Sequence, residues 1–363
     1  MPQNINDRLI HLRKRRAGTD RMDFIAQDAK DTIIANSMIN ESWEKRSPSP
    51  YTRYALGAMQ EVSAEYTRIS IETAERVGHH LDKGLKEAGF YVGFKLQGSV
   101  PLNVHIRGVS DVDLLNLDTS FYTYARGGQR SLLGLYTATS TQTSMGVLLA
   151  LRQKAENILK AQFPAAKVDT SSGKAIKISG GSLARPVDVV PSHWYDTIAY
   201  QASGREHDRG VTILNKKIPE TIDNLPFLHI KHVKDRCDFT KGGLRKAIRL
   251  CKNVKADAEV DGNVITLPSF DIAATMYHAD LQALIIGGIY ELSILVETQR
   301  HLDYLARNHT YAQTLMVPDG SRKIFDTSAK LAGLNKLSTE MDELLLQVSK
   351  EHQSSISKVL IPA

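Results

Sequence analysis

Three aspartates in two short apolar segments constrain this chain more than any other feature of its sequence. Asp111 and Asp113 open the segment DVDLLNL at 111–117, and Asp188 lies inside PVDVV at 186–190. Both segments are rich in aliphatic and β-branched residues, which favours β-strands. Because alternate side chains of a strand share a face, Asp111 and Asp113 project together while their apolar neighbours point into the core. The sequence therefore predicts a sheet that carries a cluster of carboxylates.

The residues before this cluster indicate what it binds. Gly98 and Ser99 precede Asp111 by 13 and 12 residues. A glycine lets backbone N–H groups approach a phosphate closely, and a serine adds a hydroxyl donor. Mg²⁺ is usually held by one or two carboxylates together with substrate phosphates, and two such ions can activate a hydroxyl and stabilise a leaving pyrophosphate. An Asp-x-Asp pair alone is common in solvated turns, but the whole combination predicts a nucleotidyltransferase that uses NTPs and two Mg²⁺ ions, with Mn²⁺ as an alternative.

The hydrophobic pattern divides the chain into four parts. Residues 1–47 form a polar, helical leader, 48–215 a nucleotidyltransferase catalytic lobe, 216–350 a helical lobe, and 351–363 a flexible, extended tail. We therefore expect a bilobed α+β fold with a mixed sheet in the catalytic lobe and an α-helical second lobe.

A long helix near the N-terminus is expected to bridge the two lobes. Ser49-Pro50 resembles a helix start, no proline occurs between Tyr51 and Ala88, and Gly89 is a common helix terminator. The other expected elements of the catalytic lobe are a strand at 90–97, an irregular loop at 118–146, a helix at 146–163, and a hairpin of strands at 174–178 and 186–190 that ends at Pro191.

Charge and composition narrow the class further. The net charge of +6 permits a polyanionic ligand without identifying one. The longest apolar run, Leu281–Val296, is interrupted by polar residues and falls short of the ~20 apolar residues of a membrane span. No apolar segment follows the basic N-terminus, and two cysteines in a chain of this size indicate a reducing compartment. We expect a cytoplasmic protein without membrane attachment.

Five motifs together resemble a known family. The sequence is similar to the DNA polymerase β-like nucleotidyltransferase superfamily and, within it, to the cGAS/DncV-like enzymes called CD-NTases, over roughly residues 48–310. The motifs that carry this resemblance are LQGSV at 96–100, VSDVDLL at 109–115, RPVDVVPSHW at 185–194, LRKAIRLCKNVK at 244–255 and LPSFDIA at 267–273.

The resemblance assigns roles to the catalytic-lobe residues. It implies that Asp111 and Asp113 hold both metal ions and that Asp188 holds the ion that activates the acceptor hydroxyl. It also implies that Gly98 and Ser99 contact the triphosphate. The segment that follows, VPLNVHIRG at 100–108, lacks the Gly-Thr pair that many relatives have there, and no zinc module of the vertebrate type is present.

The resemblance also selects three residues of the helical lobe. It implies that Lys252 and Ser269 grip phosphate and that Phe270 stacks on a base. Lys255 and Arg249 are alternatives to Lys252, because a helix register read from sequence is uncertain by a residue or two. Without the family, the same residues would be read as a solvated lysine, a helix cap and a core ring.

The resemblance implies a cyclic oligonucleotide second-messenger synthase that acts in anti-phage (CBASS-type) signalling. Its partners would be NTP substrates, a separate effector that recognises the product, and an activating ligand or regulatory proteins. Two alternatives stay open at this point. One is a linear nucleotidyltransferase that acts on RNA, protein or a small molecule, and the other is a non-catalytic nucleotide-binding sensor.

Overall fold

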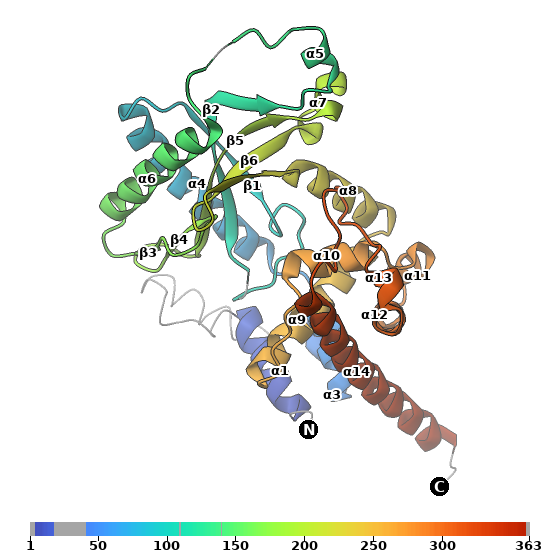
Figure 1. The fold of residues 1–363 in the computed structure, drawn as a ribbon. Helices are drawn as coiled ribbons and strands as arrows, with labels where there is room; N and C mark the ends of the chain where they lie inside the picture. The colour runs from blue at the N-terminus through green and yellow to red at the C-terminus, as the bar shows by residue number, and fades with distance from the viewer. Residues whose placement is uncertain (1–3, 18–40, 109, 139, 361–363) are drawn as a thin grey trace.

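A seven-stranded mixed sheet and a group of packed helices make up the two halves of the protein (Figure 1). The computed structural model describes residues 4–17, 41–108, 110–138 and 140–360, with side chains to residue 353. The sheet half lies at one end of the molecule and the helical half at the other, with both chain ends at the helical half (Figure 1). This arrangement agrees with the predicted bilobed α+β fold.

The main path of the sheet has the strand order β1-β2-β5-β4-β3. Strand β6 pairs with the second half of β5, and β7 pairs with β6. Strands β2 and β5 are parallel, whereas every other described pair is antiparallel. The strands are β1 Val92–Gln97, β2 Val112–Tyr124, β3 Lys167–Asp169, β4 Ile176–Ser179, β5 Val187–Asp196, β6 Gly210–Asn215 and β7 Glu220–Asn224.

Helices α4 (Ala64–Glu87) and α6 (Ser144–Gln162) cover one face of the sheet. Their apolar sides pack on the even-numbered residues of β2 and the odd-numbered residues of β5, such as Leu114 and Val189, to form a continuous core. Each fully buried aliphatic side chain of this kind contributes roughly 1.5–3 kcal/mol to folding. Asp113 and Asp188 alternate with these core residues, so they lie on the opposite face, toward the helical half.

The helical half is built around α9 (Gly243–Val260), most of whose residues are buried. Helix α3 packs on α9, and Glu351 of α14 accepts hydrogen bonds from the Tyr51 and Thr52 amides at the start of α3, at 2.9 and 2.8 Å. The other helices here are α1 Ile5–Ala17, η2 Ser42–Lys45, α3 Pro50–Met59, α8 Pro226–Phe239, α10 Ser269–Tyr277, α11 Leu281–Ile286, α12 Leu292–Arg307, α13 His309–Ala312 and α14 Ser328–Leu360.

The predicted continuous helix from Tyr51 to Ala88 is wrong between residues 60 and 63. Gln60 ends α3 in an extended conformation, and Ser63 caps α4 by accepting a hydrogen bond from the Tyr66 amide at 3.2 Å. A serine that satisfies a free N–H group at a helix start favours a new helix at that point. Two helices rather than one therefore link the halves, with α3 in the helical core and α4 in the sheet core.

Strands β2 and β5 are longer than the sequence predicts. Strand β2 continues to Tyr124 into the expected loop at 118–146, and β5 passes through Pro191 to Asp196. On one side of β5, β4 pairs with residues up to Val189 and β6 pairs from Ser192 onward. Pro191 lies between these two partners, where its missing N–H group removes no hydrogen bond from either pairing.

Two further expectations fail near the lobe boundaries. Residues 220–224 form strand β7, which pairs with β6, although their apolar spacing predicts the helical lobe from residue 216. Helix α14 runs to Leu360, so no extended tail begins at residue 351. Part of the predicted leader is helical as expected, at 5–17, and the rest of it from residue 18 to residue 40 lies outside the described residues.

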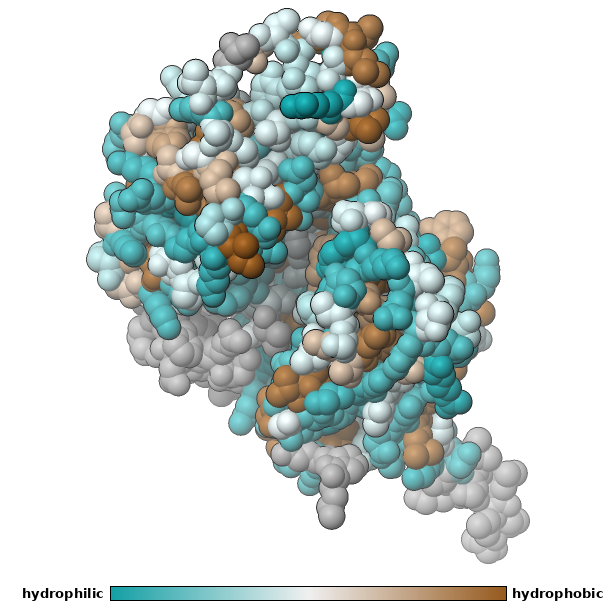
Figure 2. Space-filling model, viewed as in Figure 1, coloured by the Kyte–Doolittle hydropathy of each residue, from teal (hydrophilic) through white to brown (hydrophobic). Residues whose placement is uncertain are grey.

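The sheet half ends in an exposed apolar tip. Short helices α5 (Gln129–Leu132) and α7 (Ile198–Ser203), together with η3 (Glu206–Asp208), lie beyond the ends of β2 and β5. Figure 2 shows hydrophobic residues gathered at the top of the view, over α5 and α7, and the exposed side chains there include Leu132, Leu133 and Ile198. Among the described helices, none is long and apolar enough to cross a membrane.

Candidate active site

The sheet brings the three predicted aspartates together. Asp113 of β2 and Asp188 of β5 are directly opposite each other in the parallel pairing, and Asp111 precedes β2 by one residue. Directly opposed residues of neighbouring strands point to the same face, so the Asp113 and Asp188 carboxylates lie side by side. The predicted cluster of carboxylates is therefore formed at the beginnings of two parallel central strands.

Burial and neighbouring carboxylates raise the pKa values of Asp113 and Asp188. Burial, together with the charges of Asp188 and Asp111, raises the pKa of Asp113 to about 7. Burial and then the charge of Asp111 raise the pKa of Asp188 to about 6. The Oδ1 atom of Asp188 is also buried without a hydrogen-bond partner. A cation placed here would offset the repulsion and satisfy the buried oxygen.

This donor set fits a divalent metal ion of the magnesium type. All three side chains offer hard carboxylate oxygens, which Mg²⁺ and Mn²⁺ prefer. Within the described part of the chain, no three His, Cys, Asp or Glu side chains are already arranged around a metal position. Magnesium sites of phosphoryl-transfer enzymes usually take their remaining ligands from substrate phosphates, so an open carboxylate cluster is the expected form of the protein alone.

Position 98 requires a glycine because the backbone there lies very close to the Asp113 side chain. The turn after β1 gives Gly98 a φ of +75°, which L side chains rarely adopt. A Cβ atom on Gly98 would lie 2.1 Å from Oδ2 of Asp113. The backbone therefore lies against the carboxylate cluster here, and its contact with phosphate stays a prediction. Ser99 follows in the same turn, and its carbonyl accepts a hydrogen bond from the Val104 amide at 3.1 Å.

Three cations of α9 hold the loop that follows this turn. Arg245, Arg249 and Lys252 donate to the consecutive carbonyls of residues 102–104, at 3.2, 2.8 and 2.8 Å respectively. Their spacing along α9 puts all three on one face of the helix. Arg249 also donates to the Met59 carbonyl at 2.8 Å, so one guanidinium joins the end of α3 to the loop. The helical half thereby fixes the backbone of the candidate phosphate loop.

Lys252 lies close to the carboxylates but is not exposed. Its side chain is buried, which lowers its pKa to about 8, while the charge of Asp113 opposes that shift. Its ammonium group donates a hydrogen bond to the Val104 carbonyl. The structure therefore brings Lys252 beneath the loop, and its direct contact with phosphate stays a prediction. The alternative Arg249 is likewise buried and has a pKa lowered by burial to about 10.

Lys255 is the lysine of α9 that lies nearest to the Ser269 segment. Its ammonium donates to the Leu267 carbonyl at 2.9 Å, just before α10 begins. Pro268, rather than Ser269, occupies the cap position of α10, and Ser269 is exposed in the first turn. The interpretation of Ser269 as a helix cap is therefore wrong, and its role as a phosphate contact stays a prediction.

Phe270 is a partly exposed ring rather than a core residue, with 40% of its surface accessible. His229 stacks on it with the ring centroids 4.2 Å apart, and the guanidinium of Arg322 lies 5.3 Å from its centroid. Arg322 is held in place by buried Asp271, at 2.6 Å. The sequence gives no signal for His229 or Arg322 at this ring, because both come from segments distant in the chain.

The site also contains a lysine that the sequence analysis missed. Lys177 of β4 is directly opposite Asp188 of β5, and its ammonium forms an ion pair with Asp111. The alternation of Ile176, Lys177 and Ile178 is the one local signal, because it places Lys177 on the face opposite the core. Which carboxylate it meets depends on the strand order.

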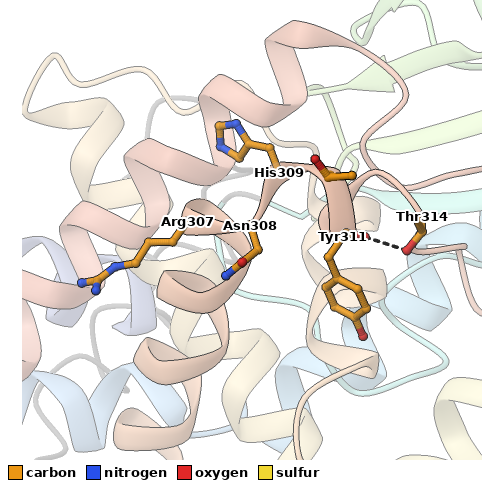
Figure 3. Close-up of a pocket in the computed structure, with 6 residues that line it drawn as sticks. Arg307, Asn308, His309, Tyr311 and Thr314 are labelled. Atoms are coloured by element: carbon orange, nitrogen blue, oxygen red, sulfur yellow. Dashed lines mark hydrogen bonds between the residues drawn. The ribbon is translucent and has the colours of Figure 1, made fainter.

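A separate open pocket of about 590 Å³ lies where α12 meets α13. Figure 3 shows its lining, which includes Arg307, His309 and Tyr311, and a hydrogen bond from Thr314 to the Tyr311 carbonyl at 2.7 Å. None of the predicted site residues lines it. It is therefore not part of the candidate active site.

Several known proteins are similar to this chain. No family model matches the sequence. The cyclic dinucleotide synthase CdnE of Yersinia aleksiciae is 44% identical over 356 residues, which cover 95% of this chain and 92% of that protein. A c-di-GMP synthase of Capnocytophaga granulosa is 32% identical over 295 residues, which cover 75% of this chain and 80% of that protein.

Two solved structures share the fold over nearly the whole chain. A STING-associated CdnE c-di-GMP synthase from Flavobacteriaceae sp. has a TM-score of 0.74 at 23% identity, covering 97% of this chain and 100% of that one. The corresponding enzyme of Capnocytophaga granulosa has a TM-score of 0.71 at 27% identity, covering 96% and 100%. The fold and the carboxylate cluster are those of a nucleotidyltransferase. The chain belongs to the CdnE-type cyclic dinucleotide synthases of the CD-NTase family, which confirms the predicted family and enzyme class.

Proposed function

We propose that this enzyme joins two NTPs into a cyclic dinucleotide at the cluster formed by Asp111, Asp113 and Asp188. A ribose hydroxyl of one nucleotide attacks the α-phosphorus of the other, the bond to pyrophosphate breaks, and a second transfer of the same kind closes the ring. The observation that carries the proposal is the pairing of Asp113 with Asp188 directly beside the Gly98 turn. This pairing supports a site where carboxylates and a phosphate-binding backbone meet.

The chain's own residues would act mainly by positioning, which supplies most of the catalysis in phosphoryl transfers. Gly98 and Ser99 would bind the triphosphate, assisted by Lys252 and Ser269, and Phe270 would stack on a base. Asp111, Asp113 and Asp188 would hold two Mg²⁺ ions, or Mn²⁺, which supply positive charge at the reacting phosphate. The α9 cations support this role because they fix the loop next to the turn.

The relatives guide the choice of substrate and partners. The Capnocytophaga granulosa relative carries the name c-di-GMP synthase, so GTP is the substrate to test first. The Capnocytophaga granulosa enzyme is described as STING-associated, and we extend this to a separate effector that recognises the product of this enzyme in anti-phage signalling. The proposal includes a cytoplasmic location, where NTPs are available, and control by an activating ligand or regulatory proteins.

Mass spectrometry of the products tests the proposal. Pure protein is incubated with all four NTPs, separately and together, with Mg²⁺ or Mn²⁺, beside the variants Asp113→Asn and Asp188→Asn. We expect a phosphatase-resistant cyclic dinucleotide from the wild-type protein and none from either variant. Linear products would identify a chain-extending transferase instead. Nucleotide binding without pyrophosphate release, under every metal and NTP condition, would identify a non-catalytic sensor.

A further inference from the structure

The face of the sheet that carries the candidate metal ligands also carries a lysine. Strand pairing places Asp113, Asp188, Lys177 and Asp169 in one row across β2, β5, β4 and β3. Directly paired residues share a face, so all four side chains project on the side away from α4 and α6. Lys177 is therefore a member of the same row as the candidate metal ligands.

The Lys177 ammonium reaches an aspartate that lies beyond its neighbouring strand. It pairs with Asp111, which adjoins β2, although Lys177 itself lies on β4 and β5 runs between them. Neighbouring strands are ~4.8 Å apart, so the lysine and the aspartate must reach toward each other over β5. The ion pair consequently lies over the strand that carries Asp188.

The charges around this ion pair are unbalanced. The row and its flank hold four carboxylates, those of Asp111, Asp113, Asp169 and Asp188, and one ammonium group, that of Lys177. The buried ammonium of Lys252 on α9 adds a second positive charge near Asp113. The Lys177 side chain keeps 42% of its surface exposed, whereas that of Asp111 keeps 21%. A partly exposed ion pair of this kind is weak, so a divalent cation that several carboxylates bind together can replace it.

We propose that Lys177 acts as a tethered counter-cation, which neutralises Asp111 in the metal-free enzyme and is displaced when a divalent cation binds. This inference rests on the proposed metal site at Asp111, Asp113 and Asp188. The released ammonium turns to Asp169, its direct neighbour on β3, whose Oδ1 accepts the Ser171 amide at 2.8 Å. Lys177 is thus a positioning residue that holds Asp111 until a divalent cation takes its place.

Mn²⁺ binding to the full chain without nucleotide tests this role, with free Mn²⁺ followed by electron paramagnetic resonance. Lys177→Met removes the competing charge, so we expect Mn²⁺ to bind roughly two- to fivefold more tightly, the range for loss of one partly exposed ion pair. Lys177→Arg should keep an affinity near that of the wild type. Lys174→Met is the matched control, because Lys174 is exposed on the same hairpin, three residues before Lys177. An unchanged or weaker affinity in Lys177→Met would overturn the inference.

Labelling of lysines gives a second readout that needs no substitution. The protein is treated with an amine-reactive ester with and without Mn²⁺, and labelling of each lysine is measured by peptide mass spectrometry. Displacement predicts that Mn²⁺ increases labelling at Lys177 and leaves Lys174 unchanged, whereas equal labelling at Lys177 would contradict displacement.

The double variant Asp113→Asn, Asp188→Asn separates this inference from the proposed function. If that variant binds Mn²⁺ like the wild type, the proposed metal site itself is wrong, and the inference about Lys177 is overturned with it. If the double variant loses Mn²⁺ binding while Lys177→Met leaves the affinity unchanged, the metal site stands and the role of Lys177 is rejected.

Discussion

Substitution of Gly98 by alanine should lower the activity of the enzyme strongly through a single contact. The new Cβ would lie 2.1 Å from Oδ2 of Asp113, whereas carbon–oxygen contacts in proteins are usually no shorter than about 3.3 Å. The carboxylate or the turn must therefore move by roughly 1 Å, and a misplacement of that size can lower a rate by about 100-fold. This corresponds to about 2.7 kcal/mol of transition-state stabilisation.

Gly89→Ala is the matched control for this substitution. Gly89 has a φ of +82°, close to the +75° of Gly98, but a Cβ atom there meets no other atom within 4 Å. Both variants therefore carry the same backbone strain, roughly 1–2 kcal/mol. Only Gly98→Ala adds the clash with Asp113, so the difference between the two variants isolates the close approach of the turn to the carboxylate.

Pyrophosphate release from GTP with Mg²⁺ would measure kcat, and thermal unfolding would measure the strain. We expect both variants to unfold at similarly lowered temperatures, while kcat falls by about 100-fold in Gly98→Ala and stays near the wild-type value in Gly89→Ala. A Gly98→Ala enzyme with a kcat within about threefold of that of Gly89→Ala would refute the argument that this contact positions Asp113.

Three further outcomes follow from the geometry. Arg249→Lys should lower the free energy of unfolding in urea by roughly 1–3 kcal/mol, because a lysine lacks the planar fork whose two separate nitrogens reach the Met59 and Asn103 carbonyls. An unchanged value would exclude that bridging role. Phe270→Leu should raise the KM for the NTP roughly tenfold with little change in kcat if the ring stacks on a base, and equal KM values would reject stacking. Burial lowers the pKa of His301 to about 4, whereas the pKa in an unfolded chain is ~6.5. The neutral ring therefore contributes its full stability above pH 6.5, and this contribution is lost as the pH falls toward 4. Through this group the wild-type protein should lose about 2 kcal/mol of its free energy of unfolding between pH 7 and pH 5, and His301→Gln should abolish that part of the loss in urea unfolding. A variant with the wild-type pH dependence would contradict this assignment.

Structural features that depend on only a few neighbouring residues can be predicted from the sequence. The alternation around Asp113 places its side chain on the face opposite its apolar neighbours, and the alternation around Asp188 does the same on a second strand; the strand pairing agrees with both. The expected helix at 146–163 is α6, and the expected strand at 90–97 contains β1. The capping signal of Ser63 was equally local and was overlooked, which accounts for the wrong single helix at 51–88.

Tertiary pairing decided where strands end. Strand β7 has a polar sequence, ETIDN, and exists because β6 offers its edge. Strand β5 continues past Pro191 because its partners change there, from β4 to β6. A pattern of side chains along one segment cannot report the hydrogen bonds that a distant segment supplies, so these boundaries could not be predicted from local sequence.

The sequence by itself determined the enzyme class of this protein, since the identity and spacing of Gly98, Asp111, Asp113 and Asp188 already predict a nucleotidyltransferase and the site proposed for it. Only the tertiary structure decided which groups surround that chemistry. Lys177 meets Asp111 across 66 residues of chain because the strand order puts β4 beside β5. Lys252 is turned beneath the candidate phosphate loop because α9 packs against it. Local periodicity fixes the face on which a side chain lies, whereas its neighbours follow from contacts between segments far apart in the chain.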